Sequence, residues 1–289
     1  MPRRTALVCA TLLAAAALPA PHGSRPAQSQ PPANSLTLFA WERGMGFQSP
    51  LRQDMRMYLR FYEWNMFEAR QPGQHTRGND RLPRSVSADH TQAEAGTDDL
   101  LLTVRAGAES ADLILAITNR TDYEWPALAA IIPCFNPGPA DSRNRELANT
   151  NTYFWGPPGL ERLEKREIHF APAHEAELRR ISPNGQFVFS GKWPTAPSGA
   201  LGGIMIRESS DGKWVTGVAW EDFLSAQAHN PWECMHLAVR VGPLKPGARK
   251  IIRGKVYLFQ GKKEDCFQRY RADFPRASSA LRDGGRGEM

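Results

Sequence analysis

The stretch Asp211–Phe259 reads DGKWVTGVAWEDFLSAQAHNPWECMHLAVRVGPLKPGARKIIRGKVYLF. Three strand-like runs surround a loop at Ala226–Trp232, and turn-forming residues separate the runs. This loop and the residues just after it carry the groups most capable of chemistry: His229, Asn230, Trp232, Cys234 and His236. The stretch predicts antiparallel strands, with any functional site close to this loop.

A first turn signal in the stretch is Ser209–Gly212, a short run of small and polar residues ending in glycine. It is predicted to join a strand at Gly203–Glu208 to one at Lys213–Glu221. The implied register places Glu208 opposite Lys213, so that opposite charges face each other across the pair.

A second turn signal, GPLKPG at Gly242–Gly247, predicts a hairpin between Glu233–Val241 and Ala248–Phe259. In this hairpin His236 faces Arg253, and Cys234 faces Lys255. Because side chains alternate along strands, one face is predicted to be core: Met235, Leu237, Val239, Val241, Ile252, Val256 and Leu258. The other face is then basic and aromatic: Cys234, His236, Ala238, Arg240, Ile251, Arg253, Lys255, Tyr257 and Phe259.

The basic and aromatic face suits an anionic or hydroxyl-rich ligand, because guanidinium groups give bidentate hydrogen bonds and rings give stacking area. The alternative is a solvated outer face covered by Arg and Lys stems. The predicted ligand-binding residues join this face to the loop: His229, Asn230, Trp232, His236, Arg240, Arg253, Lys255 and Tyr257. No catalytic residue and no reaction are assigned.

The rest of the chain also reads mainly as short strands separated by turns. Strand candidates lie at Ser35–Trp41, Leu100–Arg105, Asp112–Thr118, Ala127–Phe135, Thr152–Trp155, Glu167–Phe170, Glu177–Ile181 and Gln186–Ser190. Gln53–Phe67 fits a strand or a helix, with aromatic enrichment favouring a strand, and Glu68–Thr97 reads as a long loop. One amphipathic helix is expected at Lys262–Phe274. The fold class is therefore mainly β: a large antiparallel β-sandwich with one C-terminal helix.

The first residues have a charged start and an apolar Ala/Leu run, which predict a secretory signal peptide over residues 1–20. An uncleaved membrane anchor is the alternative. A disordered linker at 21–34, a single domain at 35–275 and a disordered tail at 276–289 are expected to follow. We expect a periplasmic or extracellular protein without a stable membrane span. The net charge is +6, yet without a Lys/Arg-rich run or a nucleic-acid motif no nucleic-acid partner is expected.

After signal removal three cysteines remain, Cys134, Cys234 and Cys266, which allow one disulfide of undecided pairing and one spare thiol. His229, Cys234 and His236 also form an H-x4-C-x-H pattern that zinc or copper could use. A disulfide or buried thiol explains Cys234 more simply, and no metal site or cofactor is assigned.

Other aromatic and acidic residues offer weaker signals. Trp155, Trp193 and Trp232 stand beside Gly or Pro, where they could stack on sugar rings or simply cover the core. Trp214 and Trp220 share one strand face and are expected in the core. Glu63 and Glu221 are a conceivable carboxylate pair for glycoside chemistry.

The second half resembles uncharacterised exported bacterial proteins with a large β-sandwich. The residues that carry this likeness are Ile132–Pro137, Gln227–His236 and Gly254–Gln260 with the following helix. In architecture, Leu100–Phe274 is similar to the galactose-mutarotase-like supersandwich of sugar epimerases and polysaccharide-degrading enzymes. The resemblance implies a carbohydrate partner, with a mutarotase-like or polysaccharide-processing enzyme among the readings. Alternatives are a non-catalytic structural or surface interaction module, and a zinc- or copper-binding protein.

Overall fold

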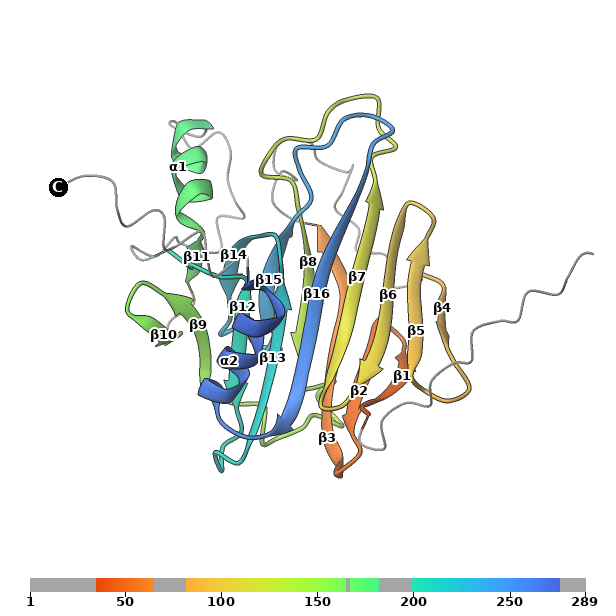
Figure 1. Ribbon diagram of the computed structural model, residues 1–289, viewed down its shortest axis with the longest axis vertical. Coiled ribbons are helices and arrows are strands. Elements are labelled where there is room, and N and C mark those ends of the chain that lie inside the picture. Colours follow the sequence, from red (N-terminus) through yellow and green to blue (C-terminus); the bar gives the residue numbers. More distant parts are fainter. Residues whose placement is uncertain (1–34, 65–81, 165–166, 182–198, 276–289) are drawn as a thin grey trace, which may run out of the picture. The chain divides into compact units, whose positions relative to one another are not determined.

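Two antiparallel β-sheets make up most of the protein (Figure 1). The computed structural model describes residues 35–64, 82–164, 167–181 and 199–275 of the 289-residue chain. The predicted signal peptide, linker and tail lie outside these residues, as do Trp193, the strand expected at Gln186–Ser190 and part of the long loop. Within the described part, the prediction of a large antiparallel β-sandwich is confirmed.

The first sheet has seven strands in the order β1-β2-β3-β8-β15-β14-β11 among the described residues. Their bounds are Thr37–Trp41 (β1), Gly44–Ser49 (β2), Arg52–Trp64 (β3), Ala130–Asn136 (β8), Met235–Arg240 (β15), Phe223–Gln227 (β14) and Ile168–Phe170 (β11). The strand reading of Gln53–Phe67 is therefore confirmed as far as Trp64.

The second sheet has nine described strands in the order β10-β9-β12-β13-β16-β7-β6-β5-β4. Their bounds are Gly159–Arg162 (β10), Thr152–Gly156 (β9), Ile204–Glu208 (β12), Trp214–Trp220 (β13), Arg249–Gln260 (β16), Ser110–Thr118 (β7), Leu100–Gly107 (β6), Gln92–Thr97 (β5) and Arg84–Val86 (β4). The strands β4 and β5 lie inside the segment that was expected to be a loop, so the loop prediction is wrong from Arg84 onward.

Side chains from both sheets form one large core between them. All seven residues predicted on the core face of the last two strands belong to it, and each is at most 1% exposed. Trp214 and Trp220 are also buried there, as predicted.

Helix α2, Lys263–Asp273, follows β16 and confirms the predicted C-terminal helix. It covers the outer face of the second sheet around β12 and β13, where a second apolar cluster forms. Its Cys266 and Tyr270 are buried in that cluster. A β-carbon on Gly217 of β13 would lie 3.0 Å from the Cys266 sulfur, so glycine lets the helix approach the sheet closely.

Helix α1, Pro172–Ile181, corrects the strand expected at Glu177–Ile181. Proline at the first helical position is already in helical geometry, and Glu175 in the first turn favours the helix dipole. Ala, Glu, Leu and Arg in the sequence PAHEAELRRI are strong helix formers. No described helix is long and apolar enough to cross a membrane.

The hairpin predicted at Ser209–Gly212 is present, but its register differs from the prediction. Glu208 pairs with Val215, and not with Lys213. The Ser209 hydroxyl accepts a hydrogen bond from the Trp214 amide, and the Trp214 carbonyl accepts one from the Ser209 amide. With these bonds, the loop that follows Glu208 is two residues longer than predicted, because Glu208 pairs with Val215 and not with Lys213. Glu208 consequently turns to Lys263 at the start of α2, 3.4 Å away.

The hairpin predicted at Gly242–Gly247 is wrong, because this segment carries the chain from the first sheet to the second. β15 pairs with β8 and β14, whereas β16 pairs with β7 and β13. The segment instead bonds to the loop between β7 and β8: the Leu244 carbonyl accepts from the Trp125 amide and the buried Asn119 side chain. Both loops lie together in Figure 1. His236 and Arg253 therefore belong to different sheets.

Candidate functional site

The structure distributes the eight predicted ligand-binding residues over three places. His229, Asn230, Trp232 and His236 lie around a disulfide on the first sheet. Lys255 and Tyr257 lie at helix α2, while Arg240 and Arg253 line a common pocket. The eight residues do not converge in one groove; Arg240 and Arg253 share a pocket, and the ligand-binding role of the eight stays a prediction.

Asn230 organises the loop that precedes β15. Its side-chain oxygen accepts hydrogen bonds from the amides of Trp232 and Cys234, and its amide group donates to the Cys234 carbonyl. His229 has positive φ and contacts the Leu163 carbonyl through Nε2. The side chains of His229 and Asn230 therefore both contact backbone groups of the protein itself. Trp232 is 64% exposed at the tip.

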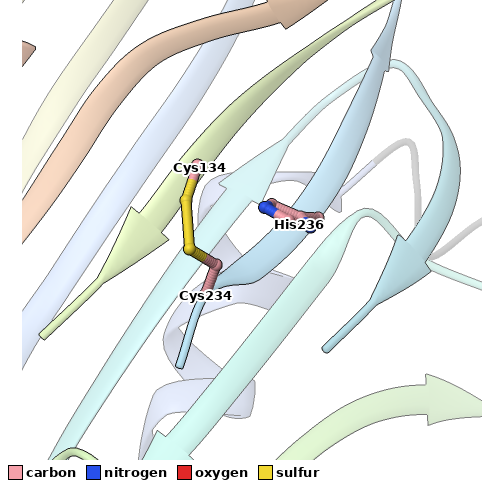
Figure 2. A group of neighbouring side chains, drawn as sticks. All are labelled: Cys134, Cys234 and His236. Carbon is pink, nitrogen blue, oxygen red and sulfur yellow. A yellow bond between two sulfur atoms is a disulfide. The ribbon is translucent and has the colours of Figure 1, made fainter. Parts of the chain in front are cut away.

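Cys134 on β8 and Cys234 just before β15 form a disulfide, which settles the pairing, and Cys266 is the buried free thiol. Figure 2 shows the His236 ring beside this disulfide. Ligand atoms of the three residues lie within 4.8 Å of one another. Thiolates are the cysteine ligands of metals, so the disulfide-bonded sulfurs do not provide the zinc or copper ligands considered from the sequence.

His236 is 8% exposed, and its Nδ1 lies 2.5 Å from the side-chain oxygen of Gln227. The pairing of β14 with β15 places these two residues directly opposite each other. Because an amide oxygen only accepts hydrogen bonds, Nδ1 carries the proton in this contact. The bond fixes the orientation of the ring next to the disulfide.

Lys255 and Tyr257 fasten helix α2 to the sheet. The buried Tyr257 hydroxyl donates to an Asp273 oxygen at 2.8 Å, and the Lys255 ammonium donates to the other at 3.2 Å. Lys255 also pairs with Asp112 at 3.1 Å. These contacts give the polar groups of both residues partners within the protein, and their predicted ligand-binding role stays a prediction.

Trp155 also contacts α2 and corrects the expectation of a loop position for ring stacking. It lies in β9, with ring centroids 5.1 Å from Phe267 and 6.2 Å from Tyr270. Its ring covers the outer apolar cluster. Glu63 lies in β3, and its side chain is outside the described part of the chain, so the pair with Glu221 stays a prediction.

Arg207 is a buried cation that the sequence did not single out. It is 1% exposed and donates to the Thr152 hydroxyl and to the carbonyls of Leu147 and Glu233. Burial lowers the pKa of its guanidinium to about 10, partly opposed by the Glu233 charge. Arg207 on β12 thus fixes the backbone next to Cys234 from the opposite sheet.

Arg240 and Arg253 line a pocket of about 740 Å³ at one end of the two sheets. We call it the Glu221–Arg253 pocket, and its lining residues are Glu221, Asp222, Arg240, Lys250, Ile251, Ile252, Arg253, Phe274 and Pro275. They come from the β13–β14 turn, the end of β15, the first half of β16 and the chain after α2. Elements distant in sequence therefore build one site.

Ion pairs fix the charged side chains of this pocket. Asp222 binds Arg240 through two hydrogen bonds of 2.8 and 3.1 Å and Lys250 through one of 2.8 Å. Glu221 accepts from the Arg253 amide at 2.6 Å and from its Nε at 3.0 Å. Three cations and two carboxylates leave an excess of one positive charge.

His174 on α1 lies near the same charges. Burial, together with the positive charges of Arg240 and Lys250, lowers the pKa of its imidazole to about 4, which the Asp222 charge partly opposes. Within the described residues, its buried Nδ1 has no hydrogen-bond partner. The imidazole is therefore neutral at pH 7.

The sequence did not single out Asp222 and Lys250, which line this pocket, or His174, which lies near their charges. A signal existed for Asp222, which forms an acidic pair with Glu221 directly after the apolar run of β13. Nothing in the sequence placed α1 beside the end of β15, so His174 had no comparable signal.

No protein-family model matches the chain, and no curated protein matches it in sequence. Similar solved structures include a galactose mutarotase-related enzyme from Lactobacillus acidophilus, with 10% identity, a TM-score of 0.42, and coverage of 81% of this chain and 97% of that one. A putative aldose 1-epimerase from Escherichia coli K12 has 10% identity and a TM-score of 0.32, with 80% and 82% coverage.

An α-N-acetylgalactosaminidase from Bifidobacterium bifidum is also similar, with 12% identity and a TM-score of 0.43. The likeness covers 83% of this chain but 37% of that larger one. All three likenesses have TM-scores below 0.5, and neither the fold nor the site of this protein is argued from them.

Proposed function

We propose that the protein is an exported carbohydrate-binding protein whose ligand occupies the Glu221–Arg253 pocket. The observation that supports this most is the set of fixed charged groups around a cavity of about 740 Å³. Pockets of this size accommodate small molecules or one part of a longer chain. Because ion pairs hold the side chains in place, a ligand does not have to order them on binding.

The chemistry of the pocket suits a hydroxyl-rich ligand. A hydroxyl both donates and accepts hydrogen bonds, and an ionised carboxylate offers about four acceptor sites. Asp222 accepts three hydrogen bonds and Glu221 two, and cationic donors lie next to both. Ile251, which is 61% exposed at the rim, offers apolar area to the carbon-bound face of a sugar ring.

Binding is better supported than catalysis. Both pocket carboxylates are paired with cations, and His174 is neutral at pH 7, so none of these groups is an evident proton donor. A mutarotase-like or polysaccharide-processing activity is the catalytic form of this proposal, and it is tested by assaying the protein on any sugar that it binds.

The alternative, a non-catalytic structural or surface interaction module, predicts a shallow, solvated basic face and no pocket near His229; His229 does not line the Glu221–Arg253 pocket, so this alternative stays a second proposal. Export is proposed on two grounds. Residues 1–20 have the pattern of a signal peptide. The Cys134–Cys234 disulfide is of a kind that persists in oxidising compartments.

A glycan-array screen of the protein without residues 1–20 tests the proposed function. We expect binding to a defined set of glycans and at least tenfold weaker binding by Asp222→Ala, which removes the acceptor shared by Arg240 and Lys250. A matched control is Asp99→Ala, which removes a similar carboxylate paired with Arg120. Binding that is equal in both variants would place the carbohydrate elsewhere.

A further inference from the structure

We propose that the ligand of the Glu221–Arg253 pocket is an acidic sugar, whose carboxylate is bound between Arg253 and Arg240. This inference rests on the proposed function and narrows its ligand class. It follows from which nitrogen atoms of the two guanidinium groups are already used, and from the charge that the pocket leaves unbalanced.

Arg253 presents the end of its guanidinium to the pocket. Glu221 accepts hydrogen bonds from its backbone amide and its Nε. The terminal nitrogens Nη1 and Nη2 make no hydrogen bond to any described residue, and the side chain is 63% exposed. Two parallel N–H groups of this kind match the two oxygens of a carboxylate. Glu221 therefore holds Arg253 in position and leaves its binding edge open.

Arg240 is held in a comparable way on the other side. Its Nε and Nη2 donate to Asp222, and its Nη1 makes no hydrogen bond within the described part of the protein. Lys250 shares Asp222 and also donates to the Arg240 carbonyl at 2.9 Å. The contacts between Asp222 and its two cations fix Arg240 and leave Nη1 as a donor.

The charge balance favours a monoanion over a neutral ligand. Arg240, Lys250 and Arg253 oppose Glu221 and Asp222, which leaves one positive charge in the cavity. A neutral sugar would cover this charge and partly remove it from water without compensation, at a cost in binding free energy. One carboxylate balances it, and the attraction grows as the ligand excludes water.

Titration calorimetry with three probes tests the inference: a hexuronic acid oligosaccharide, the neutral oligosaccharide of the same linkage, and a sulfated form of the neutral one. We expect the uronic acid form to bind at least tenfold more tightly than the other two. Its affinity should fall as salt rises from 50 to 500 mM, about a threefold contraction of the screening length.

Arg253→Gln should lower the affinity for the uronic acid form at least tenfold and so remove most of the preference for it over the neutral form. The matched control is Arg120→Gln, because the Arg120 side chain has a similar exposure, 66% against 63% for Arg253, and also pairs with one carboxylate, Asp99. Circular dichroism of both variants checks that each is folded, since Arg253 is an exposed residue whose loss leaves the core intact.

Three results would overturn the inference and are distinguishable from failure of the proposed function. Equal affinity for the neutral and acidic probes would contradict the preference for an anionic ligand, while carbohydrate binding would stand. Tighter binding of the sulfated probe than of the uronic acid form would contradict a preference for carboxylate as the bound anion. If none of the probes binds but a sugar-free monocarboxylate does, and Arg253→Gln abolishes that binding, carbohydrate binding fails while the anion site stands.

Discussion

His174 is a neutral histidine close to two cations, and its protonation is linked to folding. Its pKa is about 4 in the folded protein and 6.5 in a model peptide. Between these values the unfolded chain binds the proton and the folded one does not, so this group makes stability fall as pH decreases from 6.5 to 4. Solvent screening at this half-buried position reduces the effect to about 1–2 kcal/mol.

The variant His174→Gln should lack this contribution. Urea unfolding of both proteins at pH 7 and pH 4.5 measures it. We expect the wild type to lose about 1–2 kcal/mol more than the variant over that interval. Equal losses in the two proteins would contradict the pKa shift, since other titrating groups affect both proteins alike.

At the scale of elements, polar contacts at the end of helix α2 help to attach it to the second sheet. Asp273 at its end accepts hydrogen bonds from Tyr257 and Lys255 on β16. Phe274 and Pro275, which follow directly, line the Glu221–Arg253 pocket. The attachment of the helix therefore also positions one wall of the site.

Replacing Asp273 by Asn should lower the free energy of unfolding by about 1–3 kcal/mol, because the partly buried Lys255 ammonium loses one of its two charged partners and the Tyr257 hydroxyl loses its charged acceptor. Urea unfolding provides the measurement. Glu264→Gln on the same helix is the control, because its ion pair with Lys263 is 63% exposed on the glutamate side. A change no larger than that of the control would show that the Asp273 contacts do not contribute to the attachment of the helix.

For the whole molecule, the sequence predicted which side chains face the core better than it predicted which strands pair. Val239 and Ile252 were assigned to the core because alternation along a strand depends on local spacing. Both are buried although their strands belong to opposite sheets. Alternation is the same for a hairpin and for two strands facing each other across a core, so it could not exclude the wrong pairing.

The candidate site was predictable only in part for a related reason. Arg240 and Arg253 were identified as basic residues on the non-core side of their strands, and they do meet in one pocket. Lys255 was placed with them, but its position depends on where α2 lies on the sheet. The Cys134–Cys234 pairing likewise follows from the contact of β8 with β15, which residues about one hundred positions apart do not reveal.

That disulfide closes a loop with a sequence separation of 100 residues. In the chain-entropy description, such a crosslink stabilises the folded protein mainly by restricting the unfolded chain, by about 2–5 kcal/mol. We expect reduction by a dithiol to lower the free energy of unfolding of the wild-type protein by about this amount, as measured in urea. Cys266 is a free thiol in both states and does not contribute to the difference.

The same bond tests the compartment of the protein. Mass spectrometry of the protein recovered from the cell envelope should find a chain that begins near Pro21, with Cys134 joined to Cys234 and Cys266 free. An oxidising compartment maintains such a bond, whereas the cytosol keeps thiols reduced. Recovery of the full chain from the cytosol with three free thiols beyond Pro21, together with unchanged stability after reduction, would contradict both export and a stabilising disulfide.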